Sequence, residues 1–543
     1  MPVITLDYFD LKDLVKRDLT KEEMANIIPM LGADLKKIEM DEIHMEFFPN
    51  RPDLYSVEGV ARALNAFLQD SPGLKKYEVH PSDWVMNVEK TVLPVRPYVA
   101  CGYATNITMD DYLIVSLMNM QEKLHLTMGR NRKKVSIGIH DTREILGPLR
   151  YYGEDPNFTF IPLQMDEKMS MSEILKRHPK GIDYASILDG FNRYPLIRDT
   201  NGKVLSFPPI INGIVTTVRD DTTEMFIDVT GTDEKEVNVA LNIVATALVE
   251  RGAKIHQVAV KYPDKVCLTP NLEPKIMEVD ADYPATVLGI EFADGEVISL
   301  LEKMGYDAQK EEGVFKVSVP PYRNDILHPI DIVEDIGIGY GHDNFPATLS
   351  KAMTFGSVRS IEKDSKRIRE LMIGHGYLEV TTLTLSSQRD QFVRMDKDYH
   401  DAPIIANPLT EDHDCLRVSL LPSLLEILQA NKHRELPQRI FEIGDAVIGV
   451  KNVKMFSALE HDSKASFTTS KSLVENLFKV SGIEYTFLER DHPSFIPGRC
   501  VKVMVNDMDA GIFGELHPKV ITAFELKNPV IGLELKMEVF SSR

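Results

Sequence analysis

Several carboxylates gather around the start of one predicted helix. The stretch SVPPYRNDILHPIDIVEDIGIGYG places Asp325 before this helix and Asp331, Glu334 and Asp335 within it. Positions i, i+3 and i+4 lie on one side of a helix, where like charges repel by roughly 0.2–0.5 kcal/mol per pair. Oxygen ligands without histidine or cysteine suit a hard cation such as Mg²⁺. The alternative is a solvated acidic face at a helix N-terminus, where carboxylates also favour the helix dipole.

A second polar cluster lies near predicted strand ends in LSFPPIINGIVTTVRDDTTEMFIDVTGTDEKEV. Alternation in an extended segment puts Asp228, Thr230 and Thr232 on one face, and Asn212 lies upstream. A polar face of this kind can bind a hydroxyl group. Alternatively, Thr232 or the residue after it caps the following helix, and Asp228 is an ordinary edge residue.

Other motifs give weaker signals. In NPLTEDHDCLRVSLLPSLLEILQANKHRELPQRIFEIGDAV, the side chains of His413, Arg417, His433 and Arg434 are either phosphate ligands or solvated charges and structural partners. The sequence lacks G-x-x-x-x-G-K-[ST], H-E-x-x-H and G-x-S-x-G, so no P-loop, zincin or nucleophile elbow is expected. The glycines at 337, 339 and 341 end a helix and do not open one, which argues against a dinucleotide-binding fold.

The net charge argues against a nucleic-acid-binding surface spread over the whole molecule. The chain has 543 residues, of which 43% are hydrophobic and 27% charged, and its formal net charge is −20. A protein that neutralises phosphates needs a basic surface, so any RNA contact must come from a local patch or from a partner. The obvious local patches are GRNRKK, near Arg130, and KRHPK, near Lys176.

Cysteine usage and the N-terminus indicate a cytoplasmic protein. The four cysteines stand singly, without a C-x-x-C spacing, so neither a zinc ribbon nor a disulfide framework is expected. Acidic residues interrupt the N-terminal segment early, which excludes a signal peptide. No run of about eighteen apolar residues occurs, so we expect no membrane span.

Periodic apolar patterns predict mixed helices and strands that must position these residues. Residues 1–90 predict a strand and helices, one of them capped by Ser56. Downstream, we expect a buried helix over 112–128, strands at 134–141 and 213–218, a helix from Glu234, a helix from Pro329 to Tyr340, and a charged helix over 360–377. PNRPDL at 49–54 resembles PYRNDI at 321–326, which indicates either two small units of related fold or coincidence.

The ordered motifs carry more information than any one of them. FFPNRPDLYSVEGVARAL, LSFPPIIN, FIDVTGTD, VPPYRNDILHPIDIVEDIGIGYG, NPLTEDHDCLRVSLLPSLL, RIFEIGDAV, FIPGR and FGELHP follow one another along the chain. This set resembles the β subunit of phenylalanyl-tRNA synthetase of the archaeal type, and the resemblance extends over essentially the whole sequence.

The resemblance implies an α+β multidomain protein. The expected parts are an N-terminal α+β domain (1–90), a mixed α/β tRNA-editing domain (91–270), a small helix-containing domain with an acidic Mg²⁺ site (271–350) and a class II synthetase-like antiparallel-sheet domain (351–543). The last domain would bind the α subunit and lack an active site. GELHPKVITAFELKNPVIGLELKMEVF agrees, because it has no terminal arginine of the kind that class II catalytic segments carry.

The resemblance also implies an activity and partners. The family attaches L-phenylalanine to its tRNA using ATP, through an aminoacyl-adenylate, and works as an (αβ)₂ heterotetramer with its synthetic site on the α subunit. Asp325, Asp331, Glu334 and Asp335 match the spacing of a Mg²⁺ site shared with that subunit.

In the editing domain, hydrolysis of tyrosyl-tRNA would need a polar second site, since an apolar pocket rejects an added hydroxyl only weakly. We expect Asp228 and Thr230 to help read the tyrosine and Leu205 and Asn212 to line the pocket.

Two other functions fit the same sequence. A free-standing editing hydrolase would act on mischarged tRNA without a partner. A scaffold subunit with a decayed editing region would show no hydrolysis even in a complex.

Overall fold

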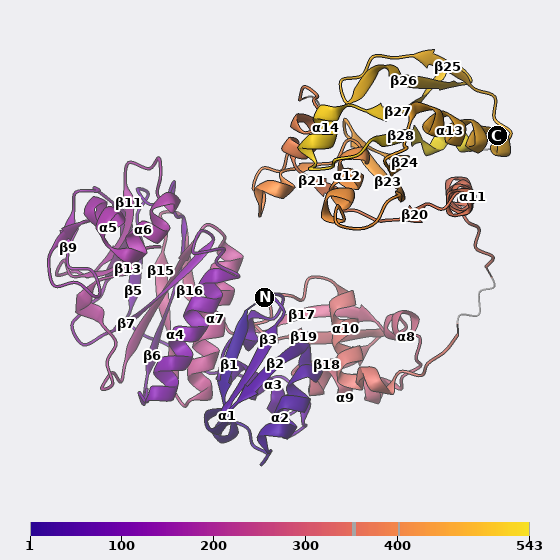
Figure 1. The fold of residues 1–543 in the computed structure, drawn as a ribbon. Coiled ribbons are helices and arrows are strands. Elements are labelled where there is room, and N and C mark those ends of the chain that lie inside the picture. Colours follow the sequence, from indigo (N-terminus) through magenta and orange to yellow (C-terminus); the bar gives the residue numbers. More distant parts are fainter. Residues whose placement is uncertain (1, 350–353, 400–401, 542–543) are drawn as a thin grey trace. The chain divides into compact units, whose positions relative to one another are not determined.

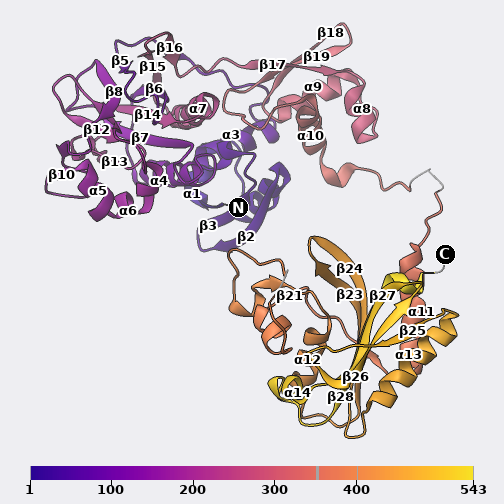
Figure 2. The same ribbon diagram turned by 90° about the horizontal axis from the view of Figure 1, so that it is seen from above.

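The computed structural model describes residues 2–349, 354–399 and 402–541. It divides into two compact units, Met1–Thr348 and Leu349–Arg543 (Figures 1 and 2). Each unit combines sheets with helices, so the fold is mixed α/β with more than one domain. The predicted boundary between 271–350 and 351–543 falls on residues 350–353, which lie outside the described part. No helix in the described residues is both long and apolar enough to cross a membrane.

The first unit begins with a three-stranded antiparallel sheet in the order β1-β3-β2. Its elements are β1 (Val3–Asp7), β2 (Ala33–Glu39) and β3 (Glu42–Phe47), with helices α1 (Tyr8–Leu14), α2 (Lys21–Ile27) and α3 (Val57–Phe67). As predicted, Ser56 caps α3, because its side chain accepts a hydrogen bond of 3.1 Å from the backbone N–H of Gly59.

The largest sheet of the first unit has eleven strands, with the path β13-β12-β11-β8-β5-β15-β6-β14-β7, while β4 and β16 pair with β15. The strands are β4 (Val79–His80), β5 (Val85–Val88), β6 (Tyr98–Thr105), β7 (Val135–Asp141), β8 (Leu149–Glu154), β11 (Tyr194–Arg198), β12 (Val204–Phe207), β13 (Ile211–Asn212), β14 (Met225–Gly231), β15 (Lys254–Lys261) and β16 (Val266–Thr269). A small separate pair consists of β9 (Thr159–Phe160) and β10 (Met169–Ser170). The accompanying helices are α4 (Asp111–Leu126), α5 (Met171–Arg177), α6 (Pro179–Tyr184) and α7 (Glu234–Glu250).

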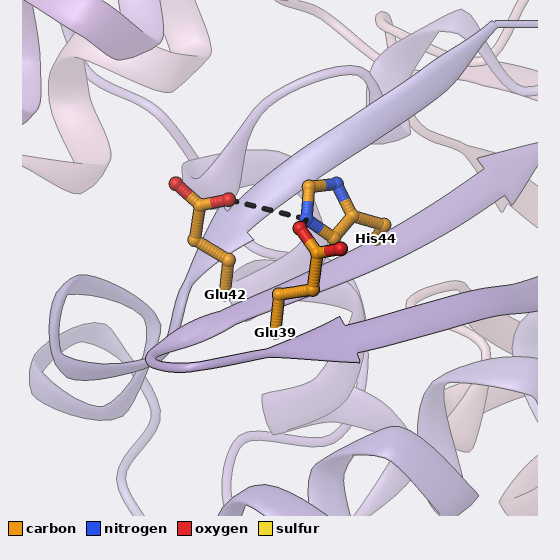
Figure 3. Close-up of side chains that lie close together, drawn as sticks. All are labelled: Glu39, Glu42 and His44. Carbon is orange, nitrogen blue, oxygen red and sulfur yellow. Dashed lines mark ion pairs between the residues drawn. The ribbon is translucent and has the colours of Figure 1, made fainter.

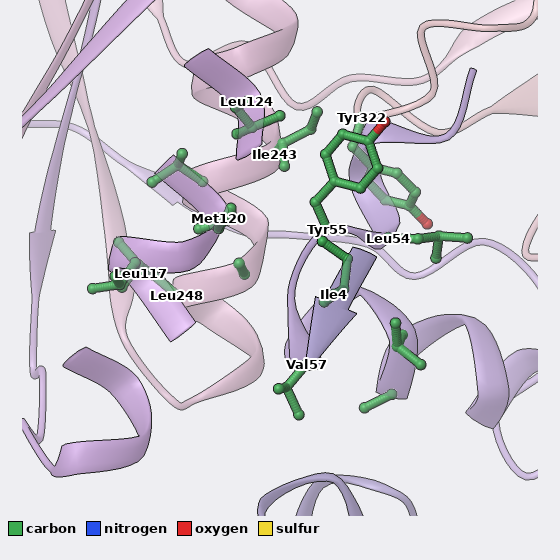
Figure 4. Close-up of a cluster of buried hydrophobic side chains, with 14 of the residues drawn as sticks. Ile4, Leu54, Tyr55, Val57, Leu117, Met120, Leu124, Ile243, Leu248 and Tyr322 are labelled. Atoms are coloured by element: carbon green, nitrogen blue, oxygen red, sulfur yellow. The ribbon is translucent and has the colours of Figure 1, made fainter. Parts of the chain in front are cut away.

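One hydrophobic core joins the N-terminal sheet to this larger sheet. Figure 4 shows side chains from β1, α3, α4 and α7 lying close together, and Tyr322 belongs to the same cluster. Helix α7 packs on β6 and β14, so one face of β14 is covered by apolar side chains while Asp228 and Thr230 point to the other face.

Two predicted elements differ from the structure. Helix α4 is not buried all round: Leu117 and Leu124 face the core, whereas Val115 and Met118 are exposed. The strand predicted over 213–218 is wrong, because Ile214–Thr216 forms a 3₁₀ turn. The hydroxyl of Thr217 donates to the carbonyl of Ile214 at 2.6 Å. Such local hydrogen bonds to the backbone compete with the pairing of this segment as a β-strand.

The first unit ends with a sheet in the order β17-β19-β18 and three helices. These are β17 (Lys275–Asp280), β18 (Asp307–Glu311), β19 (Val314–Val319), α8 (Tyr283–Leu288), α9 (Asp294–Lys303) and α10 (Pro329–Tyr340). The bounds of α10 match the prediction, since proline suits the first turn and Gly341 follows the last residue.

The second unit is built on a seven-stranded sheet in the order β20-β23-β24-β28-β27-β26-β25, antiparallel except where β20 pairs with β23. Its strands are β20 (Leu378–Glu379), β23 (Gln438–Ile448), β24 (Lys451–His461), β25 (Thr486–Glu489), β26 (Phe495–Val505), β27 (Met508–Leu516) and β28 (Val530–Lys536). A separate pair, β21 (Leu385–Ser386) and β22 (Cys415–Leu416), and helices α11 (Ser360–Gly374), α12 (Leu421–Ala430), α13 (Phe467–Ser481) and α14 (Pro518–Ala523) complete it.

Candidate functional site

A series of buried, hydrogen-bonded polar side chains lies at the β14–β7 end of the large sheet. Asp228 lies at the centre of β14, and its Oδ1 is 2.6 Å from Nε2 of His140 on β7. The other ring nitrogen of His140, Nδ1, is 2.8 Å from Oγ1 of Thr216. In the tautomer with the ring proton on Nε2, His140 donates to Asp228, and Nδ1 accepts a hydrogen bond from the hydroxyl of Thr216. A hydroxyl, an imidazole and a carboxylate in series can orient and polarise that hydroxyl.

Gly138 leaves the space that these hydrogen-bonded side chains occupy. It lies opposite Asp228 in the register of β14 and β7. A Cβ at this position would come within 2.4 Å of Asp228 Oδ1 and 2.8 Å of His140 Nε2. Only glycine therefore leaves space for the hydrogen bond between the two side chains.

Thr230 belongs to a neighbouring network around Arg96. The fully buried Arg96 donates through Nε to Thr230 Oγ1 at 2.9 Å and through Nη2 to Ser136 Oγ at 3.1 Å. Burial lowers the pKa of Arg96 to about 10, although nearby Tyr151 and Asp228 oppose this shift. The hydroxyl of Thr230 is thus occupied by an internal partner.

A groove of about 380 Å³ lies above Thr216. Eight of its lining residues are apolar or glycine, and the polar ones are Gln121, Asn212, Thr216, Thr217, Arg219 and Asp220. Asn212 is positioned by its neighbours, because Nδ2 donates to the carbonyl of Ile139 at 3.4 Å and Oδ1 accepts from Ser206 Oγ at 3.3 Å. The groove therefore offers an apolar surface with a few fixed polar groups, which is the usual character of a small-ligand site.

The four residues expected for the editing pocket do not share one environment. Asn212 lines the groove, and Asp228 lies behind it, connected through His140 and Thr216. Thr230 faces Arg96, and Leu205 is fully buried in a core cluster, so neither lines the groove. Sequence reasoning missed His140 and Thr216. The alternation in VSIGIHD, which puts His140 on the same face of β7 as Ser136 and Gly138, was the available signal.

The acidic residues near α10 do not share one polar face. Asp335 is buried and accepts from Arg323 Nη2 at 2.7 Å and from the hydroxyl of Tyr306. Asp325 accepts from Nε and Nη2 of Arg323 at 2.8 and 2.7 Å. Asp331 turns back to accept from the backbone N–H groups of residues 327 and 328 at 2.8 and 2.7 Å, and Glu334 is exposed.

The donor set still suits Mg²⁺ in its chemistry, since all the groups are carboxylates. However, among the described residues no three of these carboxylates have ligand atoms within 4.8 Å of one another. They fit a metal site only if further ligands come from a partner.

The similarity between residues 49–54 and 321–326 extends to their side-chain geometry. Arg51 donates through Nε and Nη2 to Asp53, at 2.9 Å for both bonds. Arg323 makes the same two bonds to Asp325, at the same sequence separation. The two Arg-x-Asp turns are therefore built alike.

One group in the described residues has the composition and spacing to hold a metal ion, and it was not expected. Glu39, Glu42 and His44 meet at the tip of the β2–β3 hairpin (Figure 3). His44 Nε2 is 3.1 Å from Glu42 Oε2 and 3.7 Å from Glu39 Oε2. Lys37 binds Glu39 at 2.8 Å and lowers the pKa of that carboxyl. The two glutamates are exposed, whereas the imidazole beside them is mostly buried.

In the second unit, the basic residues singled out from the sequence differ in environment. Arg417 is buried in an ion pair with Glu442 at 2.9 Å and donates to Thr382 at 2.6 Å. It is a structural partner and is not free to meet phosphate. His433 and Arg434 are exposed.

Comparison with known proteins identifies relatives for the whole chain. Residues 277–342 match the family "tRNA synthetase B5 domain", and residues 345–537 match "Phenylalanyl tRNA synthetase beta chain CLM domain". The phenylalanine–tRNA ligase beta subunits of Methanococcoides burtonii and Archaeoglobus fulgidus are each 44% identical to this chain. Both alignments cover 99% of this chain; they cover 100% of the first relative and 99% of the second.

A solved structure agrees. The crystal structure of an N-terminal fragment of the phenylalanyl-tRNA synthetase beta subunit from Pyrococcus horikoshii is 38% identical, with a TM-score of 0.61. The match covers 62% of this chain and 99% of that fragment. This chain therefore belongs to the phenylalanine–tRNA ligase beta subunit family.

Proposed function

We propose that this chain works with a separate α subunit, in an (αβ)₂ heterotetramer, to attach L-phenylalanine to its tRNA. The complex uses ATP through an aminoacyl-adenylate, and the α subunit carries the synthetic site. The observation that carries this proposal is the match over the full length of curated beta subunits. Exposed apolar side chains at and just after the edge strand β20, including Leu378 and Leu383, support a partner surface on the second unit.

The decisive experiment is phenylalanylation of tRNA by this chain alone and after mixing with the α subunit. Charging only in the mixture supports the proposal. Charging by the chain alone would place a synthetic site within residues 351–543 and overturn it. Absence of charging in both samples would favour a free-standing hydrolase.

We further propose that the first unit hydrolyses tyrosine mischarged on this tRNA. The groove supports this activity because much of its lining is apolar while Thr216 and Asn212 supply hydroxyl and amide groups, with Arg219 and Asp220 also in the lining. A site that hydrogen-bonds the tyrosine hydroxyl discriminates strongly against phenylalanine, since its polar groups would otherwise be left unpaired. Asp228 acts from behind the groove, by holding His140 and through it Thr216.

Hydrolysis is tested by incubating tyrosyl-tRNA with the complex. The editing proposal is supported if the complex releases tyrosine much faster than tyrosyl-tRNA hydrolyses by itself, while phenylalanyl-tRNA stays intact. A complex that charges phenylalanine but leaves tyrosyl-tRNA intact would identify the chain as a scaffold subunit.

We also propose that Asp325, Asp331, Glu334 and Asp335 contribute to a Mg²⁺ site shared with the α subunit. The carboxylate chemistry supports it, and Glu334 is exposed to a partner. Bound there, Mg²⁺ would neutralise these charges and connect the two subunits.

A further inference from the structure

The loop between α4 and β7 has an unusual backbone. Arg130, Asn131 and Arg132 have φ angles of 48°, 54° and 63°, so three consecutive residues other than glycine are left-handed. This region is sparsely populated by L-residues, although asparagine tolerates it better than most. Such a conformation persists only where the surrounding structure holds it, and it concentrates at functional sites.

Arg132 holds the loop in place. Its guanidinium is buried, donates to the carbonyl of Ile210 at 3.0 Å and lies 4.5 Å from the ring centre of Tyr184. It also pairs with Glu122 Oε1 at 2.9 Å. With Arg132 fixed inward, Arg130 and Asn131 are both exposed.

The second basic segment of the sequence meets this loop in space. Lys180, at the start of α6, places Nζ 3.6 Å from the same Glu122 oxygen that Arg132 binds. Arg130 and Lys133 are exposed, and neither has an ion pair within the described ranges 2–349, 354–399 and 402–541. The cations Arg130, Lys133 and Lys180 outnumber Glu122 and the exposed Asp183 of α6, which makes this a local positive surface on a chain whose net charge is −20.

This surface is linked to the groove through residues that are close to lining residues in sequence. Ile210, which accepts from Arg132, lies two residues before Asn212 of the groove lining. Glu122, which joins the two basic segments, directly follows Gln121, another lining residue. A ligand that enters the groove would therefore leave the rest of its molecule close to these cations.

We propose that Arg130, Asn131, Lys133 and Lys180 bind the phosphates of the single-stranded 3′ end of a tRNA whose aminoacyl group enters the groove. This inference rests on the proposed editing function. Phosphate contacts from lysine and arginine fix the position of a nucleic acid without reading its sequence. A strained loop that is anchored by a buried arginine presents these contacts in a fixed geometry and reduces the ordering needed on binding.

The test compares two double variants of this chain in the complex with its α subunit. R130A/K133A removes two exposed charges from the loop between α4 and β7, and the control K254A/K261A removes two exposed lysines from β15. Each complex is titrated with full-length tRNA and with the same tRNA lacking its last four nucleotides. Because each phosphate contact on a single strand contributes about 0.7 to the salt dependence, log K against log salt should flatten by about 1.4 for R130A/K133A with full-length tRNA.

We expect R130A/K133A to weaken binding of full-length tRNA by about tenfold and to leave the truncated tRNA unaffected. Equal weakening of both RNAs, or no more weakening than the control shows, would overturn the inference. Failure of the editing proposal itself is recognised separately, because the unmutated complex would then bind tRNA but not hydrolyse tyrosyl-tRNA.

Discussion

Replacing Asp228 by asparagine tests whether the buried carboxylate controls the groove. Asparagine has nearly the same shape, so it fits the space that Gly138 leaves, but it carries no charge. The bond to His140 is 2.6 Å long and lies in the interior, where hydrogen bonds to charged groups are worth about 1.5–3 kcal/mol. An amide oxygen still accepts from Nε2, so we expect about 1–2 kcal/mol of the interaction to be lost.

That loss corresponds to a decrease of about 5- to 30-fold in kcat/KM for hydrolysis of tyrosyl-tRNA by the complex. Phenylalanylation should remain within about twofold, because the synthetic site is proposed to lie on the α subunit. The assay follows release of labelled tyrosine from tyrosyl-tRNA and, in parallel, formation of phenylalanyl-tRNA.

The matched control is Asp199→Asn. Asp199 is also buried in the first unit, but it accepts from the backbone N–H groups of Lys203 and Leu146, at 2.7 and 3.2 Å, and does not line the groove. Hydrolysis that survives Asp228→Asn within twofold would refute the reasoning. An equal loss of hydrolysis in Asp199→Asn would show that the effect comes from general destabilisation of the first unit.

Three further predictions follow from the same structure. His140→Ala should reduce tyrosyl-tRNA hydrolysis. Adding Asp228→Asn to His140→Ala should cause no further loss, because both residues act through the same series of hydrogen bonds; additive losses would contradict this. Burial, followed by the charge of the neighbouring Asp390, raises the pKa of Glu426 to about 7. The folded state therefore binds this proton more tightly than the unfolded state, so the free energy of unfolding falls as pH rises from about 4.5 to 7. Glu426→Gln should therefore stabilise the chain by about 1–2 kcal/mol at pH 8, after allowance for partial exposure, and by almost nothing at pH 4, as measured by thermal unfolding; equal effects at both pH values would be inconsistent with it. D331N/E334Q should reduce Mg²⁺ bound by the complex, measured by metal analysis after dialysis, and unchanged metal content would exclude these ligands.

Local signals made some elements predictable from the sequence. Pro329 and Gly341 bracket α10, and a polar side chain precedes α7, so the bounds of these helices depend on residues adjacent in sequence. The segment 213–218 has the composition of a strand, yet hydroxyl groups bond back to nearby carbonyls and close a turn. Such competition between side chain and backbone is hard to judge without the fold.

The candidate site was only partly predictable because its partners are distant in sequence. Asp228 and Asn212 were identified from their segments, but His140 lies 88 residues from Asp228. They meet because β7 is paired with β14 in a register that sets Gly138 opposite Asp228. A shift of one residue in that register would turn His140 away, and no local pattern specifies the register of two strands so far apart.

Arg323 explains how the acidic start of α10 is stable within this chain. Its guanidinium serves both Asp325 and Asp335, and two backbone N–H groups serve Asp331, so repulsion at this helix start is offset internally. Glu334 alone is exposed. The spacing of the carboxylates therefore does not by itself demand a metal, and a bound Mg²⁺ would compete with Arg323 for the same oxygens. Ligands from the α subunit would raise the affinity of the site for Mg²⁺, so the complex should retain the ion under conditions in which the isolated chain loses it.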